Sequence, residues 1–219
     1  MHTLLIDLDG TLSDSATGIL HSLRRAFADV GVPVPDDTTM RSLLGPPFYE
    51  SLPPLVGADR LPAIIEAYRK YYDTAMFDTK LYDGMLDVLA DLRTRDITLA
   101  VATSKPEAFA VPIIEYLGIA DYFATIGGDA LDGSRDTKAK VIAAVMDRLG
   151  SPDPAYALML GDRSHDVDGA RAHGIDCLGA GWGYGRPGEL DAAAEVFAVP
   201  SAMLAAHDRI FGARDAATA

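Results

Sequence analysis

Residues 4–11 read Leu4-Leu5-Ile6-Asp7-Leu8-Asp9-Gly10-Thr11, and they decide how the rest of the chain is interpreted. The first three residues form a short, continuous apolar run, which is typical of a strand covered on both faces. Two carboxylates, Asp7 and Asp9, follow this run directly. In an open parallel sheet the binding crevice lies beyond the carboxyl ends of the strands. The stretch therefore predicts a buried strand that carries acidic groups to such a crevice.

A long stretch with helical periodicity separates this strand from the other predicted strands. Between about Ser13 and Tyr82 apolar residues recur at helical spacing, first at Ile19, Leu20, Leu23, Phe27 and Val30, and later at Leu61, Ile64, Ile65, Tyr68 and Tyr72. Gly45-Pro46-Pro47 breaks the chain between the two groups. We therefore expect residues 14–82 to form an inserted, all-helical cap on a core made of residues 1–13 and 83–219.

Strand and helix patterns alternate from Asp83 onward. Further strands are expected at residues 97–102, 122–126, 155–160, 177–179 and 196–199, with helices between them. Pro112 lies inside one of these helices and should bend or interrupt it. Strands that alternate with helices indicate an α/β fold with a doubly wound, Rossmann-like parallel sheet.

Composition excludes several classes of partner. The formal net charge of -13 argues against binding to a nucleic-acid backbone, which needs clustered Lys and Arg. No apolar run approaches the ~20 residues of a membrane span, and the N-terminus lacks the pattern of a signal peptide. Cys177 is the only cysteine, which fits a reducing cytoplasm. We expect a cytoplasmic protein without a membrane or nucleic-acid partner, and its oligomeric state stays open.

Polar side chains follow three of the predicted strands. Besides Asp7 and Asp9, Thr103 and Ser104 follow one strand, and another is followed by Asp162, with Asp166 four residues later. Lys138 opens a helix between the last two groups. Each residue alone is more often a cap, a turn residue or a solvated side chain. Their joint occurrence at strand ends is what indicates a site.

This set of residues suits hydrolysis of a phosphate ester. Clustered carboxylates are the oxygen ligands that Mg²⁺ prefers, and the ion would offset the charge of the ester. Asp7 can attack phosphorus, and Asp9 can protonate the leaving oxygen and then deprotonate water. Thr103 can donate to a phosphoryl oxygen, and Lys138 can neutralise charge on the transferred group.

The same residues resemble the haloacid dehalogenase superfamily. Its four motifs are matched, in order, by Asp7-Leu8-Asp9-Gly10-Thr11, by Val101-Ala102-Thr103-Ser104-Lys105-Pro106, by Lys138 and by Gly161-Asp162-Arg163-Ser164-His165-Asp166. The helical insertion after the first motif looks like that superfamily's first-position cap. Gly45-Pro46-Pro47 and Tyr82-Asp83-Gly84 look like its phosphoglycolate phosphatase and 5′-nucleotidase-like branch.

The resemblance implies a role for each site residue. Asp7 would be the nucleophile and Asp9 the acid/base; Thr103 and Lys138 would hold phosphate. Mg²⁺ would be bound by Asp7, the Asp9 carbonyl and Asp162, with Asp166 in support. Many relatives place Pro after the third-motif lysine, whereas Ala139 follows Lys138, so Lys140 is a competitor. Candidate substrate-binding residues are Ser104, Lys105, Gly45 and Arg41.

The expected function is Mg²⁺-dependent hydrolysis of a small phosphorylated metabolite, phosphoglycolate- or nucleotide-like, through an aspartyl phosphate. One alternative is a receiver-like switch that keeps its aspartyl phosphate, although the ready acid/base Asp9 favours turnover. Another is a sugar phosphomutase of the same fold, which would carry a His in its first cap helix. The nearest candidate, His21, is displaced from that position. A dehalogenase would lack Asp9, and a silent binding module would be expected to have lost some of the motifs.

Overall fold

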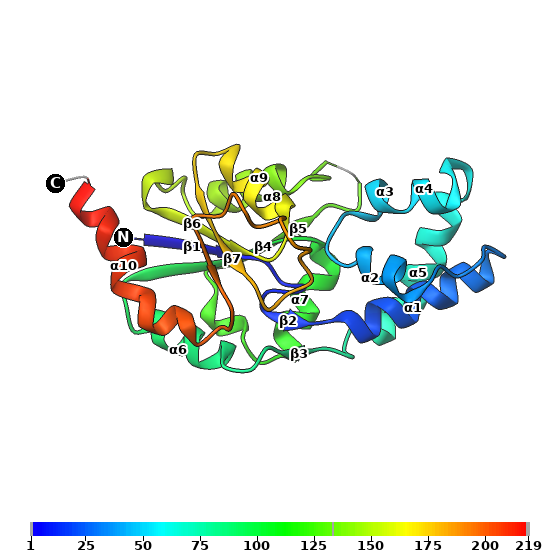
Figure 1. The fold of residues 1–219 in the computed structure, drawn as a ribbon, viewed down its shortest axis with the longest axis horizontal. Helices are drawn as coiled ribbons and strands as arrows, with labels where there is room; N and C mark the ends of the chain where they lie inside the picture. Colours follow the sequence, from blue (N-terminus) through cyan, green and yellow to red (C-terminus); the bar gives the residue numbers. More distant parts are fainter. Residues whose placement is uncertain (1, 133, 218–219) are drawn as a thin grey trace.

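A six-stranded parallel sheet forms the centre of the protein (Figure 1). The computed structural model describes residues 2–132 and 134–217. The strand order is β5-β4-β1-β6-β7-β8. The strands are β1 (His2–Ile6), β4 (Ile97–Pro106), β5 (Thr125–Asp129), β6 (Ala157–Gly161), β7 (Asp176–Ala180) and β8 (Glu195–Phe197). The predicted α/β class with a doubly wound parallel sheet is confirmed.

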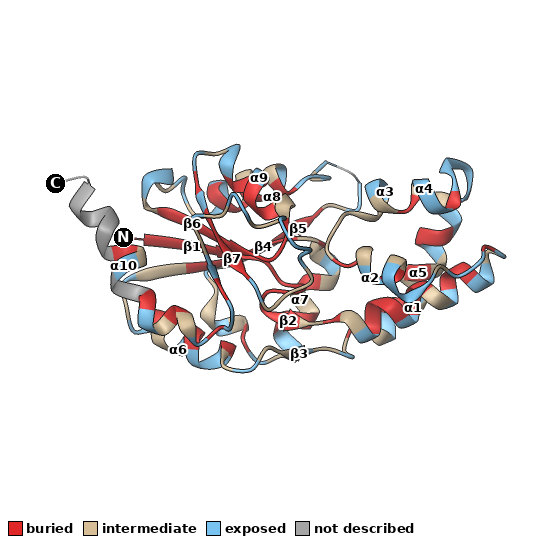
Figure 2. Ribbon diagram, in the orientation of Figure 1, coloured by how far each residue is buried: buried red, intermediate tan, exposed pale blue. Residues whose placement is uncertain are grey.

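Helices cover both faces of the sheet, which explains the uninterrupted apolar run of β1. Leu4 and Ile6 face a core shared with α6 (Met85–Arg93), α7 (Glu107–Tyr116) and α10 (Ala202–Ala217). Leu5 faces the opposite core, which contains α8 (Lys138–Arg148) and α9 (Ser164–Arg171). Figure 2 shows the central strands β1 and β6 as buried along their length. Helices therefore shield both faces of each central strand from solvent, and a ligand can reach functional side chains only at the strand ends.

Residues 14–82, which we call the helical segment, lie beyond the carboxyl end of β1 (Figure 1). The segment consists of α1 (Ala16–Asp29), α2 (Asp37–Ser42), α3 (Phe48–Ser51), α4 (Pro53–Val56), the 3₁₀ helix η1 (Ala58–Arg60) and α5 (Leu61–Ala75). α1 and α5 pack against each other through the apolar faces that the sequence predicts. Asp36 caps α2, because its side chain accepts a hydrogen bond from the backbone N–H of Thr39.

The expectation of helices alone between Ser13 and Tyr82 is wrong at both ends. β2 (Ser13–Asp14) and β3 (Lys80–Leu81) pair as a short antiparallel ribbon where the chain leaves the core and returns to it. Two residues are too few to show a period of two, so the sequence carried no signal for these strands. The ribbon ties the two connections together and fixes where the helical segment is attached.

Some boundaries also differ from the sequence pattern. β5 begins at Thr125 rather than at residue 122, because Ala120–Tyr122 form a 3₁₀ helix, η2. Another, η3 (Pro154–Tyr156), precedes β6. Helix α7 continues through Pro112, and packing of its buried face outweighs the missing hydrogen bond. Within the described ranges, none of the helices combines the length and apolar character that a bilayer crossing requires.

Candidate active site

Three carboxylates meet at the carboxyl ends of β1 and β6. Asp7 follows β1, and its backbone N–H donates to the carbonyl of Leu160 on β6 at 2.9 Å. Asp162 follows β6, and Asp166 lies in the first turn of α9. One oxygen from each of the three side chains lies within 4.8 Å of the others, and all three residues are buried. The parallel pairing of β1 with β6 thus brings the first and fourth motifs into contact.

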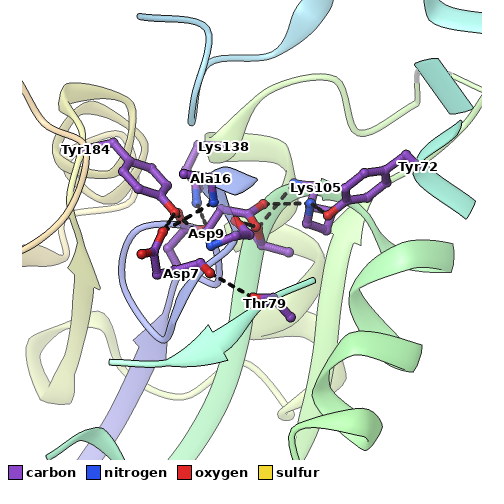
Figure 3. Close-up of polar contacts among 11 residues, drawn as sticks. Asp7, Asp9, Ala16, Tyr72, Thr79, Lys105, Lys138 and Tyr184 are labelled. Carbon is purple, nitrogen blue, oxygen red and sulfur yellow. Dashed lines mark hydrogen bonds and ion pairs between the residues drawn. The ribbon is translucent and has the colours of Figure 1, made fainter. Parts of the chain in front are cut away.

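Lys138 reaches into this cluster from the first turn of α8. Its Nζ lies 2.8 Å from Asp7 Oδ1 (Figure 3). The same nitrogen lies 2.7 Å from Asp166 Oδ1 and donates to the Ala102 carbonyl at 3.0 Å. Burial opposes its charge, but Asp166 and Asp7 outweigh that effect and raise the pKa of Lys138. Lys140 is exposed and pairs with Asp136 instead. The structure therefore places Lys138, not Lys140, beside Asp7.

The cluster carries more negative than positive charge. Burial, together with the charges of Asp166 and Asp7, raises the pKa of Asp162 well above its usual value. Burial also raises the pKa of Asp166, although Lys138 opposes the shift. A divalent cation with oxygen ligands would offset this excess, and the three oxygens lie close enough together to share one ion. The donor set fits Mg²⁺.

Asp9 lies on the side of the site that faces the helical segment. Its Oδ1 accepts a hydrogen bond from Ser15 Oγ, and its Oδ2 lies 2.9 Å from Lys105 Nζ. Lys105 Nζ also donates to the Tyr72 hydroxyl of α5 at 2.7 Å (Figure 3). A chain of contacts thus links the helical segment to Asp9. Lys105, expected only as a substrate ligand, contacts Asp9 directly.

Thr103 and Ser104 lie in the last part of β4. The register between β4 and β5 shifts between Thr103 and Pro106, and Thr103 Oγ1 accepts from the backbone N–H of Lys105 at 3.2 Å. Thr103 is buried directly after Ala102, whose carbonyl accepts from Lys138. Ser104 is half-buried. This end of β4 therefore positions Lys105 toward Asp9.

A cavity opens between Asp9 and the helical segment. Gly45, Ser104 and Lys105 line it, as the sequence predicts for substrate-binding residues. Arg41 is exposed on α2, and among the described residues the guanidinium that lines the cavity is Arg69 of α5. The structure therefore does not bring Arg41 to this site. Spacing on α5 could have singled out Arg69 only if the direction of that helix over the core had been known.

Sequence reasoning missed Arg163, although it lies inside the fourth motif. Its buried guanidinium donates to the Leu44 carbonyl and pairs with Glu189, with Nε 2.6 Å from Oε2. Gly45 has φ +95°, and a Cβ added there would lie 3.0 Å from Arg163. The loop before Gly45 is therefore tied to the residue that follows Asp162.

The glycine-rich stretch at residues 181–185 is also part of the site. The backbone N–H of Tyr184 donates to Asp162 Oδ2 at 2.6 Å. A Cβ on Gly183 would lie 2.3 Å from the Asp162 side chain, so glycine is needed for this close approach. The Tyr184 hydroxyl donates to Asp14 Oδ1 and accepts from the backbone N–H of Ser15, both at 2.8 Å (Figure 3). This stretch therefore supports Asp162 and the start of the helical segment.

The fold and the buried acidic cluster agree with one family of enzymes. The sequence model of the family described as haloacid dehalogenase-like hydrolase matches residues 4–180, and the chain belongs to this family. The resemblance inferred from the four motifs is confirmed.

Several known proteins are similar to the chain. Tyrosine-protein kinase PtkA of Mycobacterium tuberculosis is 45% identical over 189 residues, which are 86% of this chain and 65% of PtkA. A 5′-nucleotidase of Pseudomonas aeruginosa is 36% identical, with 86% of each chain covered. A crystal structure of a predicted phosphatase from Clostridium acetobutylicum has 34% identity and a TM-score of 0.88, and the match covers 95% of this chain and 97% of that one.

Proposed function

We propose that the protein is a magnesium-dependent phosphomonoesterase that transfers the phosphoryl group of a small ester first to Asp7 and then to water. The observation that carries the proposal is the position of Asp7. Its buried carboxylate lies against Lys138 and beside Asp162 and Asp166 at the carboxyl edge of the sheet. Membership of a hydrolase family and the similarity to a 5′-nucleotidase support the same reaction.

Asp7, Asp162 and the backbone carbonyl of Asp9 would hold Mg²⁺, with Asp166 in support. When bound, the ion would lower the negative charge that an incoming phosphate ester meets. Lys138 would contribute the second positive charge at the phosphoryl group. Electrostatic stabilisation of this kind supplies much of the rate enhancement in phosphoryl transfer.

The two steps share the same carboxylates. Asp7 attacks phosphorus, the bond to the ester oxygen breaks, and Asp9 gives its proton to the leaving alkoxide. Asp9 then takes a proton from water, the water oxygen attacks phosphorus, and the bond to Asp7 breaks to release inorganic phosphate. Ser15 and Lys105 orient the Asp9 carboxylate for both proton transfers.

The alternatives receive less support. A sugar phosphomutase would carry a His in its first cap helix, and His21, the nearest candidate, is exposed on α1. A receiver that keeps its phosphoryl group would not need an acid/base beside the nucleophile, whereas Asp9 lies two residues after Asp7. The kinase name belongs to a relative of which the match spans 65%. Hydrolysis is therefore the reaction that these residues support best.

The test is release of inorganic phosphate from a panel of phosphate esters, with Mg²⁺ and with excess chelator. We expect turnover only with the metal. A labelled ester should give a burst of phosphoenzyme in the wild type and none in Asp7→Asn, because an amide is a poor nucleophile. Asp168→Asn is the matched control, since Asp168 is exposed on α9 and pairs with Arg171. Unchanged turnover in chelator, or a normal burst in Asp7→Asn, would refute the proposal.

A further inference from the structure

The cavity beside Asp9 is mostly apolar and aromatic. Asp9, Ser104 and Lys105 lie on its wall from the core, and the helical segment closes it from the other side. Most of the remaining lining is without charge and comprises Ile19, Leu43, Gly45, Pro46, Pro47, Phe48, Tyr49, Ile65, Tyr68, Tyr72, Pro106 and Phe109. A leaving group attached to a phosphate at Asp7 would lie in this space. The walls therefore favour an apolar body over a small polar one.

Four of these side chains form a continuous aromatic wall. The ring of Phe48 meets Tyr68 edge-on at 4.7 Å, and Tyr68 stacks on Tyr72 at 5.0 Å. Tyr72 then meets Phe109 of α7 at 5.6 Å. Because the Tyr72 hydroxyl binds Lys105, the wall starts beside the acid/base. Flat ligands gain most from such a surface, since ring pairs add ~0.5–1.5 kcal/mol beyond buried area.

Asp129 adds a polar group to the same cavity. It lies at the carboxyl end of β5, in register with Pro106, and is 9% exposed. Its Oδ1 has no hydrogen-bond partner within the part of the chain that the structure describes. Burial raises the pKa of the Asp129 carboxyl, while a backbone hydrogen bond from Ala130 and the charges of Arg135 and Arg69 oppose the shift. A buried acceptor without a partner costs free energy, and a ligand N–H would supply the missing donor.

We propose that this cavity selects a phosphomonoester whose leaving group carries an aromatic ring and an amino or ammonium group, and that Asp129 accepts a hydrogen bond from that group. The inference rests on the proposed function and narrows its substrate class. Two sources share this chemistry: the amino-substituted base of a nucleoside 5′-monophosphate and the ammonium group of O-phosphotyrosine. Phosphoglycolate has neither a ring nor an amino group.

Matched esters test the inference directly. The measurement is kcat/KM for AMP against IMP, for CMP against UMP and for O-phosphotyrosine against phenyl phosphate, with phosphoglycolate and glycerol phosphate as ring-free esters. Within at least one pair the ester with the amino or ammonium group should have the higher kcat/KM by about tenfold to a hundredfold, which is the value of one hydrogen bond to a charged group. The pair that shows the preference identifies the source. Equal values within all three pairs would refute the role of Asp129, and ring-free esters as good as aromatic ones would refute the inference entirely.

Two variants test whether Asp129 causes the preference between the paired esters. Asp129→Asn should bring the ratio within the discriminating pair close to one, because an amide can both donate and accept. Asp121→Asn, on the exposed 3₁₀ helix η2, is the control and should leave the ratio unchanged. An unaltered ratio in Asp129→Asn would overturn the assignment.

Equilibrium binding separates this inference from the proposed function. Dissociation constants of the same esters for the Asp7→Asn protein in Mg²⁺, measured by calorimetry, need no turnover. If the wild type hydrolysed none of the esters, the proposed function would fail, and the binding ratios would still decide the selectivity. The same tenfold preference supports the inference, and equal dissociation constants within every pair refute it.

Discussion

At the scale of single residues, Lys138 is the buried cation that pairs with two carboxylates of the site. It is the side chain that contacts both Asp7 and Asp166, at 2.8 and 2.7 Å, and it is buried with them. Lys138→Ala should lower turnover of an aryl phosphate by about two to three orders of magnitude, the usual loss for one preorganised electrostatic group. Lys140→Ala should have little effect, because Lys140 is exposed. The comparison is kcat for both variants.

The same substitution should also destabilise the fold, because it leaves two carboxylates buried without their cation. Loss of one partner of a buried ion pair typically costs ~3–5 kcal/mol, and thermal unfolding of both variants would measure it. Comparable, mild losses of turnover in Lys138→Ala and Lys140→Ala would place the phosphate-binding lysine elsewhere.

Lys105 permits a second test at this scale. It holds the Asp9 carboxylate at 2.9 Å, so its loss should impair proton donation to the leaving oxygen more than attack by Asp7. An alkyl phosphate needs that proton, whereas nitrophenolate leaves readily without it. Lys105→Met should therefore reduce turnover of alkyl phosphates by about tenfold more than turnover of p-nitrophenyl phosphate, within the range of acid catalysis. Exposed Lys70 supplies the control variant Lys70→Met. A loss of equal size for both esters would mean that Lys105 does not act through Asp9.

The residues that the sequence could place are those at strand ends. Asp7, Asp162 and Thr103 follow apolar runs, and parallel strands bring their carboxyl ends to one edge of the sheet. Asp129 and Tyr72 could not be placed in the same way. The sequence pattern ends the strand at residue 126, before Asp129, whereas β5 extends to Asp129. The position of Tyr72 depends on how α5 is oriented about the cavity, which no local pattern encodes. Arg41 was expected at the substrate site for its position near a chain break, but such proximity does not determine the direction in which a side chain points.

At the scale of elements, length decides what a pattern can predict. Long amphipathic helices such as α1 and α5, and apolar strands such as β1 and β6, repeat often enough to be recognised. The ribbon of β2 and β3 spans two residues per strand and shows no period. Pro112 shows a different limit. It does not interrupt α7, which continues from Glu107 to Tyr116, and Ala110, Ile113 and Ile114 of this helix are buried.

At the scale of the whole molecule, side chains next to the site residues connect the core to the helical segment. Lys105 binds the Tyr72 hydroxyl, Arg163 binds the Leu44 carbonyl, and the His165 ring lies 3.4 Å from Glu50. Each core residue lies within three positions of a residue that we assign to the reaction. Contacts that hold the helical segment over the cavity thus also orient the site, as expected where closure excludes water from a reaction.

Arg163 is the contact through which this coupling can be tested. Glu189 holds two nitrogens of its guanidinium, at 2.6 and 3.1 Å, which leaves the third nitrogen to donate to Leu44. A lysine keeps the charge but cannot make this forked arrangement. Arg163→Lys should therefore loosen the loop at residues 43–48, raise KM severalfold and speed amide hydrogen exchange there, while exchange in β1 and β6 stays slow. The control is Arg171→Lys on the exposed face of α9. Exchange that is unchanged at residues 43–48 while KM rises would mean that Arg163 acts on the ester directly and not by holding the helical segment in place.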